Sequence, residues 1–528
     1  MTTAHARRPQ VRPRRGSPAW YQAMHPTTRY AQQVVDGVTV AGPHVRLACA
    51  RHLRDLERQE TDGFPYRFDE EEAHRAFDFF EEELRLYEGE FEGKPFVLND
   101  WQMFVIGSLF GWLKPDGMRR FETAYIETGK GSGKSPMSGG TALKCLCADN
   151  EPGAQVFFAG ALRTQSEIPF RDAKTMAKTS PALAAKLHIT EHNIDYPAGN
   201  GFLRPISSEA GNLTGKRVHC GIIEELHEHG DAKVLNAMRK GTKSRRQALL
   251  IIITNSGMDR RSICWEQHEY SRRVVQGAIV DEAWFAYVCA LDLCEAHLTD
   301  GKDMPVDGCE TGCDQWTDEA VWPKTNPSLP ITPGYDYLRK QVLEAANMPS
   351  AADETKRLNF CIWTSGKVAW IRPEVWNLQK EPKKIRDRTG FAGYDLSEVN
   401  DITAAAYVFY DGQDAIDIKL NCFLPEGRID ALAAVSKVPY RRWVDEGWIR
   451  LTTGETVNHD FLEAADDKMR AKYRILAQGI DPWHAGQFAA RMEQKGLRLV
   501  RVPQTNQALH AAVEEFEVLL QVKGVRHG

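Results

Sequence analysis

The run Glu127-Thr-Gly-Lys-Gly-Ser-Gly-Lys134-Ser135-Pro-Met137 decides the fold. An alternating, strand-like segment from Phe121 to Ile126 precedes it, and a helical segment from Ser135 to Ala148 follows it. Strand, glycine-rich turn and helix in this order form a phosphate cradle, because backbone N–H groups of the turn and of the helix N-terminus point at anionic oxygens. The sequence therefore predicts a P-loop within an α/β domain.

Each residue of this cradle has an expected role. Lys134 is expected to reach the β- and γ-phosphates of ATP, and Ser135 to ligate Mg²⁺. The other residues expected to surround the phosphates are Gly129, Lys130, Gly131, Ser132 and Gly133. The match to the usual pattern is imperfect, because Thr128 stands where the first glycine belongs. An ordinary glycine-rich loop is the alternative, and the flanking strand and helix argue against it.

Two carboxylates follow a short apolar strand that begins at Val218, and they are Glu224 and Glu225. In ATPases the first such carboxylate holds Mg²⁺, usually through water, and the second polarises the water that attacks the γ-phosphate. The usual first residue is Asp, so the longer side chain of Glu224 requires an adjusted metal geometry. A solvated pair at a strand end is the alternative, and the position downstream of a P-loop argues against it.

Three further side chains are candidates for the nucleotide site. The apolar strand from Ala248 ends in Thr254 and Asn255. Functional groups collect at the carboxyl ends of parallel strands, so these two are expected to sense the γ-phosphate and to couple hydrolysis to motion. A simple turn explains them equally well. Gln102 opens the apolar segment 103–112 and could read an adenine edge through its amide, although a helix-start role fits as well.

Length and composition indicate a large enzyme of a reducing compartment. A chain of 528 residues with 42% hydrophobic content predicts two or three domains with real cores. The net charge of −5 does not indicate nucleic-acid binding, so any DNA contact must come from local basic patches. No long apolar run suggests a membrane span, and five arginines among prolines predict a disordered basic arm over residues 1–30. Helices are expected over 44–60, 69–88 and 168–186, and a further strand over 155–161.

The eleven cysteines are odd in number and scattered, which indicates free thiols. Cys309 and Cys313 are close together, as zinc ligands are. No second cysteine pair offers zinc spacing, so the sequence favours thiols without a structural metal.

The C-terminal part of the chain predicts a separate domain after a basic polar linker over residues 377–389. Strands are expected over 391–395, 403–410 and 415–423, then a helix over 460–472 and a strand over 475–480. Three consecutive strands followed by alternating helix and strand indicate an RNase H-like sheet.

Asp395 and Asp481 follow two of these strands and are expected to face one site. Two such carboxylates bind a pair of Mg²⁺ or Mn²⁺ ions roughly 4 Å apart, which activate water and stabilise the leaving oxygen of a phosphodiester. Asp401 lies just past the first Asp and could assist. A structural role for single Asp residues at strand ends is the alternative.

The motifs, in this order and spacing, resemble the large terminase subunit of tailed double-stranded DNA phages, of the HK97-like group. The segments that carry the resemblance are the P-loop, Leu98–Gln102 with Phe110-Gly-Trp112, Ile222–Glu228, Ile253–Gly257, Val321-Trp322 through Asn326-Pro327-Ser328, and Trp363 with Ala369-Trp370. The resemblance covers the chain from about Ala31 onward. It implies a packaging ATPase domain over residues 31–375, a linker over 376–389 and an RNase H-like nuclease domain over 390–528.

The resemblance also implies activities and partners. Such a subunit uses ATP and Mg²⁺ to move double-stranded DNA into a procapsid, and cuts concatemeric DNA with a Mg²⁺- or Mn²⁺-dependent nuclease. Its partners are DNA, a small terminase subunit, the portal protein of the procapsid and like subunits in a ring, with no membrane. The implied location is the cytoplasm of the bacterial host, outside the mature virion.

Two features depart from the family pattern. Members of the family carry a basic residue four positions before the P-loop lysine, usually Arg, and here it is Lys130. A lysine can still stabilise transition-state charge in cis but lacks the planar fork of Arg. The chain ends at Val525-Arg-His-Gly528, where the family continues toward a further acidic residue, so an incomplete nuclease domain is expected.

Two other functions remain open on the sequence. A helicase or remodelling ATPase would also use a P-loop, but Asp395 and Asp481 argue against it. A nuclease-dead, prophage-derived DNA-binding remnant is the other alternative.

Overall fold

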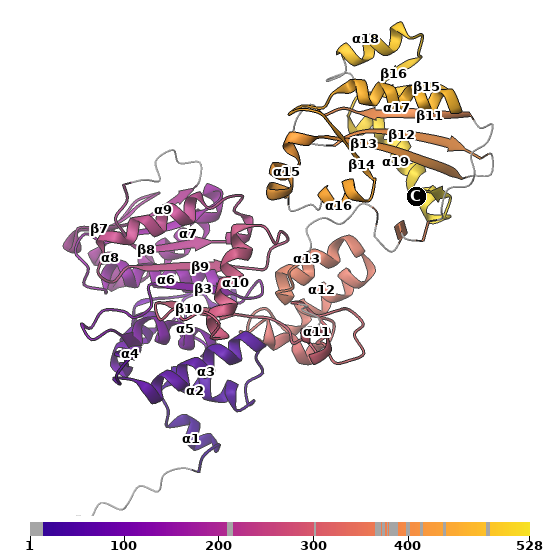
Figure 1. Cartoon of the computed structure of the whole chain (residues 1–528). Coiled ribbons are helices and arrows are strands. Elements are labelled where there is room, and N and C mark those ends of the chain that lie inside the picture. Colours follow the sequence, from indigo (N-terminus) through magenta and orange to yellow (C-terminus); the bar gives the residue numbers. More distant parts are fainter. Residues whose placement is uncertain are drawn as a thin grey trace, which may run out of the picture. The chain divides into compact units, whose positions relative to one another are not determined.

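The computed structural model describes residues 14–207, 215–299, 303–364, 371, 375–376, 378–379, 389–397, 402–411, 415–436, 440–481 and 486–527. The chain divides into two compact units, Met1–Gly366 and Lys367–Gly528 (Figure 1). This division lies upstream of the expected domain boundary, since Val375 and Trp376 pack against Leu520 of the second unit. Most of the expected linker and Asp401 lie outside the described residues.

An eight-stranded sheet forms the centre of the first unit, in the order β10-β3-β9-β8-β4-β7-β6-β5. The six strands from β10 to β7 run parallel, and β6 and β5 add an antiparallel edge. The bounds are β3 Thr123–Glu127, β4 Gln155–Gly160, β5 His188–Ile189, β6 Ile194–Tyr196, β7 Gly201–Ser207, β8 Val218–Glu224, β9 Leu249–Thr254 and β10 Trp284–Val288. β8 and β9 are buried along their whole length, as expected for parallel strands covered on both faces.

Helices cover this sheet on both faces (Figure 1). Those before β4 are α1 Pro18–Gln22, α2 Pro26–Val35, α3 Pro43–Arg58, α4 Glu70–Asp78, the π-helix η1 Phe79–Glu83, the 3₁₀ turn η2 Gly89–Phe91, α5 Asp100–Gly111 and α6 Lys134–Cys147. Those that follow, up to β10, are α7 Arg163–Thr179, α8 Pro181–Lys186, the 3₁₀ turns η3 Pro197–Gly199, η4 Leu226–Glu228 and η5 Thr242–Ser244, α9 Lys233–Gly241 and α10 Ile263–Val275. A short two-stranded sheet pairs β1 Arg67–Phe68 with β2 Trp112–Leu113.

Three expected segments differ in the structure. The helix expected over 69–88 is shorter in the structure. It consists of α4, which continues into the π-helix η1 and ends at Glu83. The helix expected over 168–186 begins at Arg163 and breaks at Ser180, because the residue before a proline disfavours helical geometry. Helices α1 and α2 occupy part of the expected disordered arm, whose first thirteen residues lie outside the described part.

A small helical group follows β10 and has its own core (Figure 1). Its elements are α11 Glu295–Thr299, the 3₁₀ helix η6 Glu319–Lys324, α12 Tyr335–Asn347 and α13 Pro349–Phe360. Trp322, Leu338 and Phe360 are buried in this core. We call residues 289–364 the lid segment.

The second unit is built on a seven-stranded sheet in the order β14-β13-β12-β11-β15-β16, with β17 beside β13. β11, β12 and β13 are antiparallel, and β15 lies parallel to β11. The strands are β11 Thr389–Asp395, β12 Thr403–Tyr410, β13 Ile416–Pro425, β14 Ile449–Thr452, β15 Arg474–Ile480, β16 Leu499–Arg501 and β17 Val525–Arg526. The helices are η7 Glu426–Arg428, α15 Ile429–Ser436, α16 Tyr440–Asp445, α17 His459–Lys472, α18 Gly486–Gln494 and α19 Asn506–Gln521. The expected fold class, a P-loop sheet followed by an RNase H-like sheet, is confirmed.

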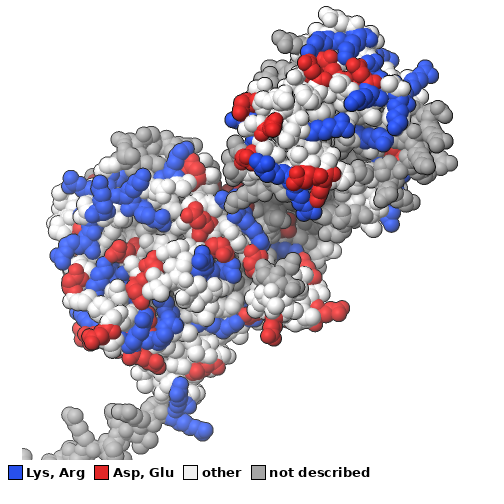
Figure 2. Space-filling model, in the orientation of Figure 1, with Lys and Arg blue, Asp and Glu red and all other residues white. Residues whose placement is uncertain are grey.

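Charged side chains of both signs are interspersed over the face of each unit that Figure 2 shows. A DNA contact through local basic patches therefore stays a prediction. Within the described residues, no helix combines the length and apolar character that crossing a membrane requires.

Candidate active sites

The P-loop joins β3 to α6, and its glycines are required by the backbone. Gly131 and Gly133 have φ angles of +86° and +80°, a left-handed conformation that side chains disfavour. A Cβ added to Gly129 would lie 2.5 Å from Oδ1 of Asn326. The turn is therefore a tight backbone cradle that the lid segment contacts closely.

Lys134 lies at the start of α6 with its ammonium group inside the cradle. The side chain is buried, and its Nζ donates to the carbonyl oxygens of Thr128 at 2.8 Å and Gly129 at 3.3 Å, and to Oδ1 of Asn255 at 3.1 Å. The positive charge is thus held at the point where phosphate oxygens would enter.

The other cradle residues take different positions. Ser135 is the second residue of α6 and is half-buried. Ser132 Oγ donates to the Gly129 carbonyl at 2.8 Å and closes the turn. The Lys130 side chain is exposed, while its N–H donates to the Leu358 carbonyl at 2.7 Å. A role of Lys130 on the phosphate stays a prediction.

Glu224 is the last residue of β8 and Glu225 follows it directly; β8 lies two strands from the P-loop strand β3. Glu224 is buried, and its Oε1 has no hydrogen-bond partner among the residues that the structure describes. Burial, together with the charge of Glu225, raises the pKa of Glu224 to about 8. For Glu225, burial raises the pKa, but the hydrogen bond with His227 and the charge of Lys134 outweigh it, so the net pKa is lowered. The two carboxylates therefore differ in charge state near neutral pH.

His227 is a site residue that the sequence analysis missed. Its Nδ1 lies 3.1 Å from Oε2 of Glu225 and its Nε2 lies 3.0 Å from Oε1 of Glu228. Burial lowers the pKa of His227, but the hydrogen bonds that its ring donates to the carboxylates of Glu225 and Glu228 raise the pKa overall. The imidazole fixes the orientation of Glu225. The sequence shows a histidine two positions after the paired carboxylates. No local pattern in the sequence indicates that the chain folds back so that this histidine contacts Glu225.

Asn255 connects the parts of the candidate nucleotide site. Its Oδ1 accepts from Lys134, and its Nδ2 donates to the carbonyl oxygens of Thr128 at 2.8 Å and Leu358 at 3.1 Å. Its backbone N–H hydrogen-bonds Glu225. The neighbouring Thr254 Oγ1 accepts from the His227 N–H at 3.1 Å. The structure thus brings both residues to the carboxyl end of β9, next to the P-loop.

Gln102 lies beside the P-loop and also starts a helix. Its Oε1 accepts from the Asn99 N–H at 3.1 Å, which completes a capping box at α5. Its Nε2 donates to the Gly133 carbonyl at 3.4 Å. The helix-start role is therefore present, and the reading of adenine stays a prediction.

The lid segment contacts the cradle at four points that the sequence analysis did not place. The N–H of Gly129 donates to the Thr325 carbonyl at 2.8 Å, and the N–H of Lys130 to Leu358. Ser328 Oγ donates to the Ser132 carbonyl, and Thr332 Oγ1 to the Gly131 carbonyl, each at 2.8 Å. Asn326-Pro327-Ser328 was noted only as a family motif.

Glu127 is a second missed residue, at the end of β3. Its carboxylate accepts from Tyr125 at 2.7 Å, Ser256 at 2.8 Å and Trp363 at 3.0 Å, and lies 2.7 Å from Nδ1 of His268. Burial raises its pKa, but His268 and these hydrogen bonds lower it overall. The anchored carboxylate ties β3 to the end of the lid segment.

Asp395 is the last residue of β11, and Asp481 directly follows β15, the neighbouring parallel strand of the second unit. Tyr394 and Ile480 are register partners of β11 and β15, so the next residue of each strand lies at the same edge of the sheet. Asp395 is exposed and Asp481 is half-buried, so both carboxylates are accessible. The metal-binding role of these residues stays a prediction.

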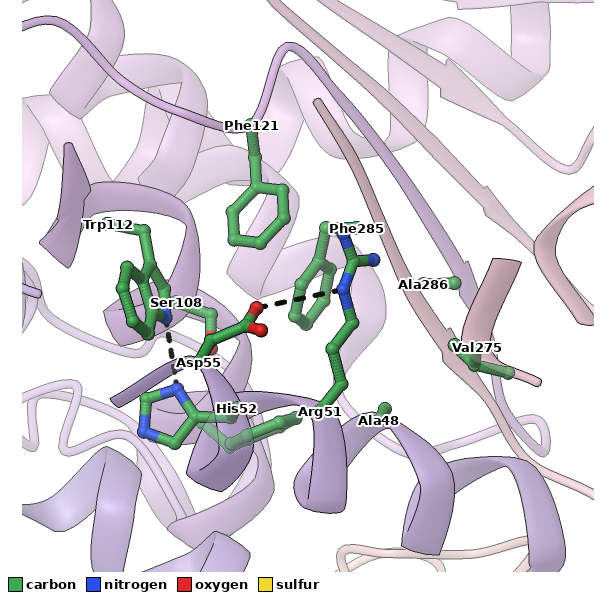
Figure 3. Close-up of a pocket in the computed structure, with 11 residues that line it drawn as sticks. Ala48, Arg51, His52, Asp55, Ser108, Trp112, Phe121, Val275, Phe285 and Ala286 are labelled. Atoms are coloured by element: carbon green, nitrogen blue, oxygen red, sulfur yellow. Dashed lines mark hydrogen bonds and ion pairs between the residues drawn. The ribbon is translucent and has the colours of Figure 1, made fainter. Parts of the chain in front are cut away.

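A small pocket elsewhere in the first unit is separate from the nucleotide site (Figure 3). It lies between α3, α5 and β10, where Trp112 Nε1 donates to His52 Nδ1 at 3.0 Å and Arg51 pairs with Asp55 at 3.8 Å. Its volume of ≈ 20 Å³ holds about one water molecule. It is therefore part of the core and not a ligand site.

These features define the class of protein to which the chain belongs. It consists of a P-loop ATPase unit followed by a nuclease-type α/β unit. The ATPase domain model of the terminase large subunit matches residues 100–273, and the endonuclease domain model of the same family matches residues 309–528. The chain belongs to the family of terminase large subunits and is related to the HK97 group.

Two curated relatives are similar over much of the chain. The terminase large subunit of Enterobacteria phage HK97 is 24% identical over 474 residues, which cover 86% of each chain. Protein YmfN of Escherichia coli K12 is 21% identical over 328 residues, which cover 59% of this chain and 67% of YmfN.

Three solved structures are also similar. The HK97 large terminase has a TM-score of 0.47 at 21% identity and covers 86% of this chain and 90% of its own. The large terminase of a thermophilic bacteriophage, solved in complex with ATP-gamma-S, has a TM-score of 0.29 at 10% identity, covering 77% and 83%. The large terminase nuclease of thermophilic phage G20c with bound magnesium has a TM-score of 0.20 at 12% identity, covering 29% and 71%.

Proposed function

We propose that this chain is the motor subunit of a phage DNA-packaging machine, which hydrolyses ATP to move double-stranded DNA into a procapsid and cuts concatemeric DNA. The observation that carries the proposal is the position of Asn255, which contacts the P-loop lysine, the Glu225 carboxylate and the carbonyl of Leu358 in the lid segment. A change in the contacts of Lys134 with the phosphate would therefore alter the contacts of Asn255 with both Glu225 and the lid segment.

The residues present fit ATP with Mg²⁺. Lys134 can exchange a carbonyl contact for phosphate oxygens, and the backbone of the cradle supplies further donors. The unpartnered Oε1 of Glu224 and the hydroxyl of Ser135 would hold the metal. When bound, Mg²⁺ neutralises charge on the β- and γ-phosphates.

Glu225 is the proposed base that orients the attacking water. Its pKa is lowered, so the carboxylate is ionised and can accept a hydrogen bond from water. His227 holds it from one side, and Lys134 balances its charge across the site. Lys130, exposed at the rim of the cradle, would approach the γ-phosphate in cis.

The nuclease function is proposed for Asp395 and Asp481, which would hold two Mg²⁺ or Mn²⁺ ions, with Asp401 nearby in sequence. Their support is the shared edge of β11 and β15 and the match to the endonuclease domain model. Carboxylate oxygens are also the ligands that suit Mg²⁺ and Mn²⁺.

The proposed partners follow from family membership. They are double-stranded DNA, the small terminase subunit, the portal protein of the procapsid and further copies of the chain in a ring. The proposed place of action is the cytoplasm of the bacterial host.

Exchanging the paired carboxylates separates their roles. Glu225→Gln is expected to bind ATP but to lose hydrolysis by roughly 100-fold or more, because the water loses its base. Glu224→Gln is expected to weaken Mg²⁺-dependent ATP binding instead. Nucleotide binding by fluorescence and turnover by phosphate release measure the two effects.

Asp231→Asn is the matched control, because this exposed carboxylate lies in the same loop and pairs with Lys233 on the surface. Asp231→Asn should leave both nucleotide binding and ATP turnover unchanged. Normal hydrolysis by both glutamine variants would show that the paired carboxylates are not the hydrolytic groups.

A further inference from the structure

Four metal-ligating side chains converge in the lid segment, away from both proposed active sites. Cys294 directly precedes α11 and His297 lies within it, a few residues after β10, and Cys309 and Cys313 lie in the stretch that follows. One ligand atom from each lies within 4.8 Å of all the others. The sequence analysis looked for a second cysteine pair and did not consider Cys294 and His297, a Cys-x₂-His pair that completes the set.

The distances between these atoms fit a tetrahedral zinc centre. Cys294 Sγ lies 3.6 Å from Cys313 Sγ and 3.9 Å from Cys309 Sγ. His297 Nδ1 lies 3.2 Å from Cys294 Sγ, 3.2 Å from Cys313 Sγ and 3.5 Å from Cys309 Sγ. Zinc bonds of about 2.3 Å to sulfur and about 2.0 Å to nitrogen place sulfur atoms about 3.8 Å apart and nitrogen about 3.5 Å from sulfur.

We propose that Cys294, His297, Cys309 and Cys313 bind a structural zinc ion. Three thiolates and one imidazole in tetrahedral arrangement are the ligands that zinc prefers, and four protein ligands leave no open position for catalysis. His297 offers Nδ1 to the site, so the proton of its neutral imidazole lies on Nε2.

The surroundings of the sulfur atoms support thiolates. The N–H of Cys294 lies 3.3 Å from Cys313 Sγ, and Thr311 Oγ1 lies 3.0 Å from Cys294 Sγ and 3.1 Å from Cys309 Sγ. Donors of this kind orient metal-bound thiolates. These three cysteines are free thiols, and the two sulfur–sulfur distances from Cys294 far exceed the disulfide bond length of about 2.05 Å.

The position of the cluster indicates what the zinc stabilises. Asp292 and Asp314 flank the ligands, and both accept from Lys324 Nζ at 2.7 Å. The carbonyl of the next residue, Thr325, accepts the N–H of Gly129 in the P-loop. Few regular elements lie between β10 and η6 in the described part of the chain, so a metal that joins the two halves of this stretch would hold the lid segment against the cradle.

Metal analysis of the purified full chain tests the site. We expect about one zinc ion per chain, and a cobalt-exchanged protein with the strong visible absorption of tetrahedral thiolate ligation. Cys309→Ser combined with Cys313→Ser should lose the zinc and lower the melting temperature. Cys422→Ser is the matched control, because this partly exposed free cysteine lies in the second unit and should keep the metal.

Wild-type protein that holds no zinc after expression and refolding in zinc, and that gives no tetrahedral cobalt spectrum, would overturn the proposal even if the double variant fails to fold. Zinc retained by a folded double variant would place the metal elsewhere and would overturn it as well. The lid role rests on the proposed ATPase function, whereas the metal site does not. Lys134→Ala should therefore keep its zinc whatever happens to its turnover, which separates failure of one proposal from failure of the other.

Discussion

Lys134→Ala is expected to abolish ATP hydrolysis, with a loss of at least roughly 100- to 1,000-fold. The ammonium group is the only lysine charge inside the cradle among the described residues, and it would stabilise the charge that develops on the phosphates. Alanine also leaves the carbonyl oxygens of Thr128 and Gly129 without their donor, so ATP binding should weaken together with turnover. Phosphate release under saturating ATP and Mg²⁺ measures the effect.

The fold should survive this change, because the site lies at the carboxyl edge of the sheet and outside the apolar core. Circular dichroism and the melting temperature check this. Lys178→Ala, an exposed lysine in the last turn of α7, is the matched control and should hydrolyse ATP normally. Turnover in Lys134→Ala at the rate of the control would contradict the P-loop assignment.

Asp395→Ala and Asp481→Ala are each expected to reduce metal-dependent DNA cleavage by roughly 100-fold or more while sparing ATP hydrolysis. Two divalent ions need converging carboxylates, and the loss of either side chain should empty at least one metal position. The ATPase should be unaffected because the P-loop lies in the other compact unit. Conversion of supercoiled plasmid in Mg²⁺ or Mn²⁺ measures cleavage.

Asp430→Ala provides the comparison in the same unit, since this exposed carboxylate pairs with Arg441 on the surface. It should cut DNA as the unmodified chain does. If the Asp395→Ala and Asp481→Ala variants cleave DNA at the rate of Asp430→Ala, the nuclease site lies elsewhere.

The parts of the site that could be predicted from sequence are those encoded locally. The P-loop is one continuous stretch of sequence, and its glycines, its lysine and its flanking strand and helix together predict phosphate binding. The strands that lead into Glu225 and Asn255 were predicted because buried parallel strands are continuous apolar runs. Asp395 and Asp481 were predicted to face one site because the order of the strands indicated that the two strands that lead to them are neighbours in one sheet.

The parts that were missed depend on contacts between distant segments. His227 and Glu127 take their roles from partners such as Thr254 and His268, which only the folded chain brings near. The contact of Ser328 in the lid segment with the P-loop spans almost two hundred residues. The proposed zinc ligands were missed because one pair is Cys-x₂-His and the other is Cys-x₃-Cys, and only the fold brings the two pairs together.

The strands β5, β6 and β7 were also missed. Two of them span only two or three residues, too few for a period-two pattern to appear in the sequence. β7 pairs parallel with β4, and β6 and β5 add the antiparallel edge beyond β7, an arrangement with no local signal in the sequence.

The rate of ATP hydrolysis by the purified full chain, measured with and without duplex DNA, tests the central claim most directly. A packaging motor should hydrolyse ATP in Mg²⁺ faster when duplex DNA is present, and the DNA should remain double-stranded. The Glu225→Gln chain should show no such stimulation. Turnover that is indifferent to duplex DNA, or that separates its strands, would contradict the account.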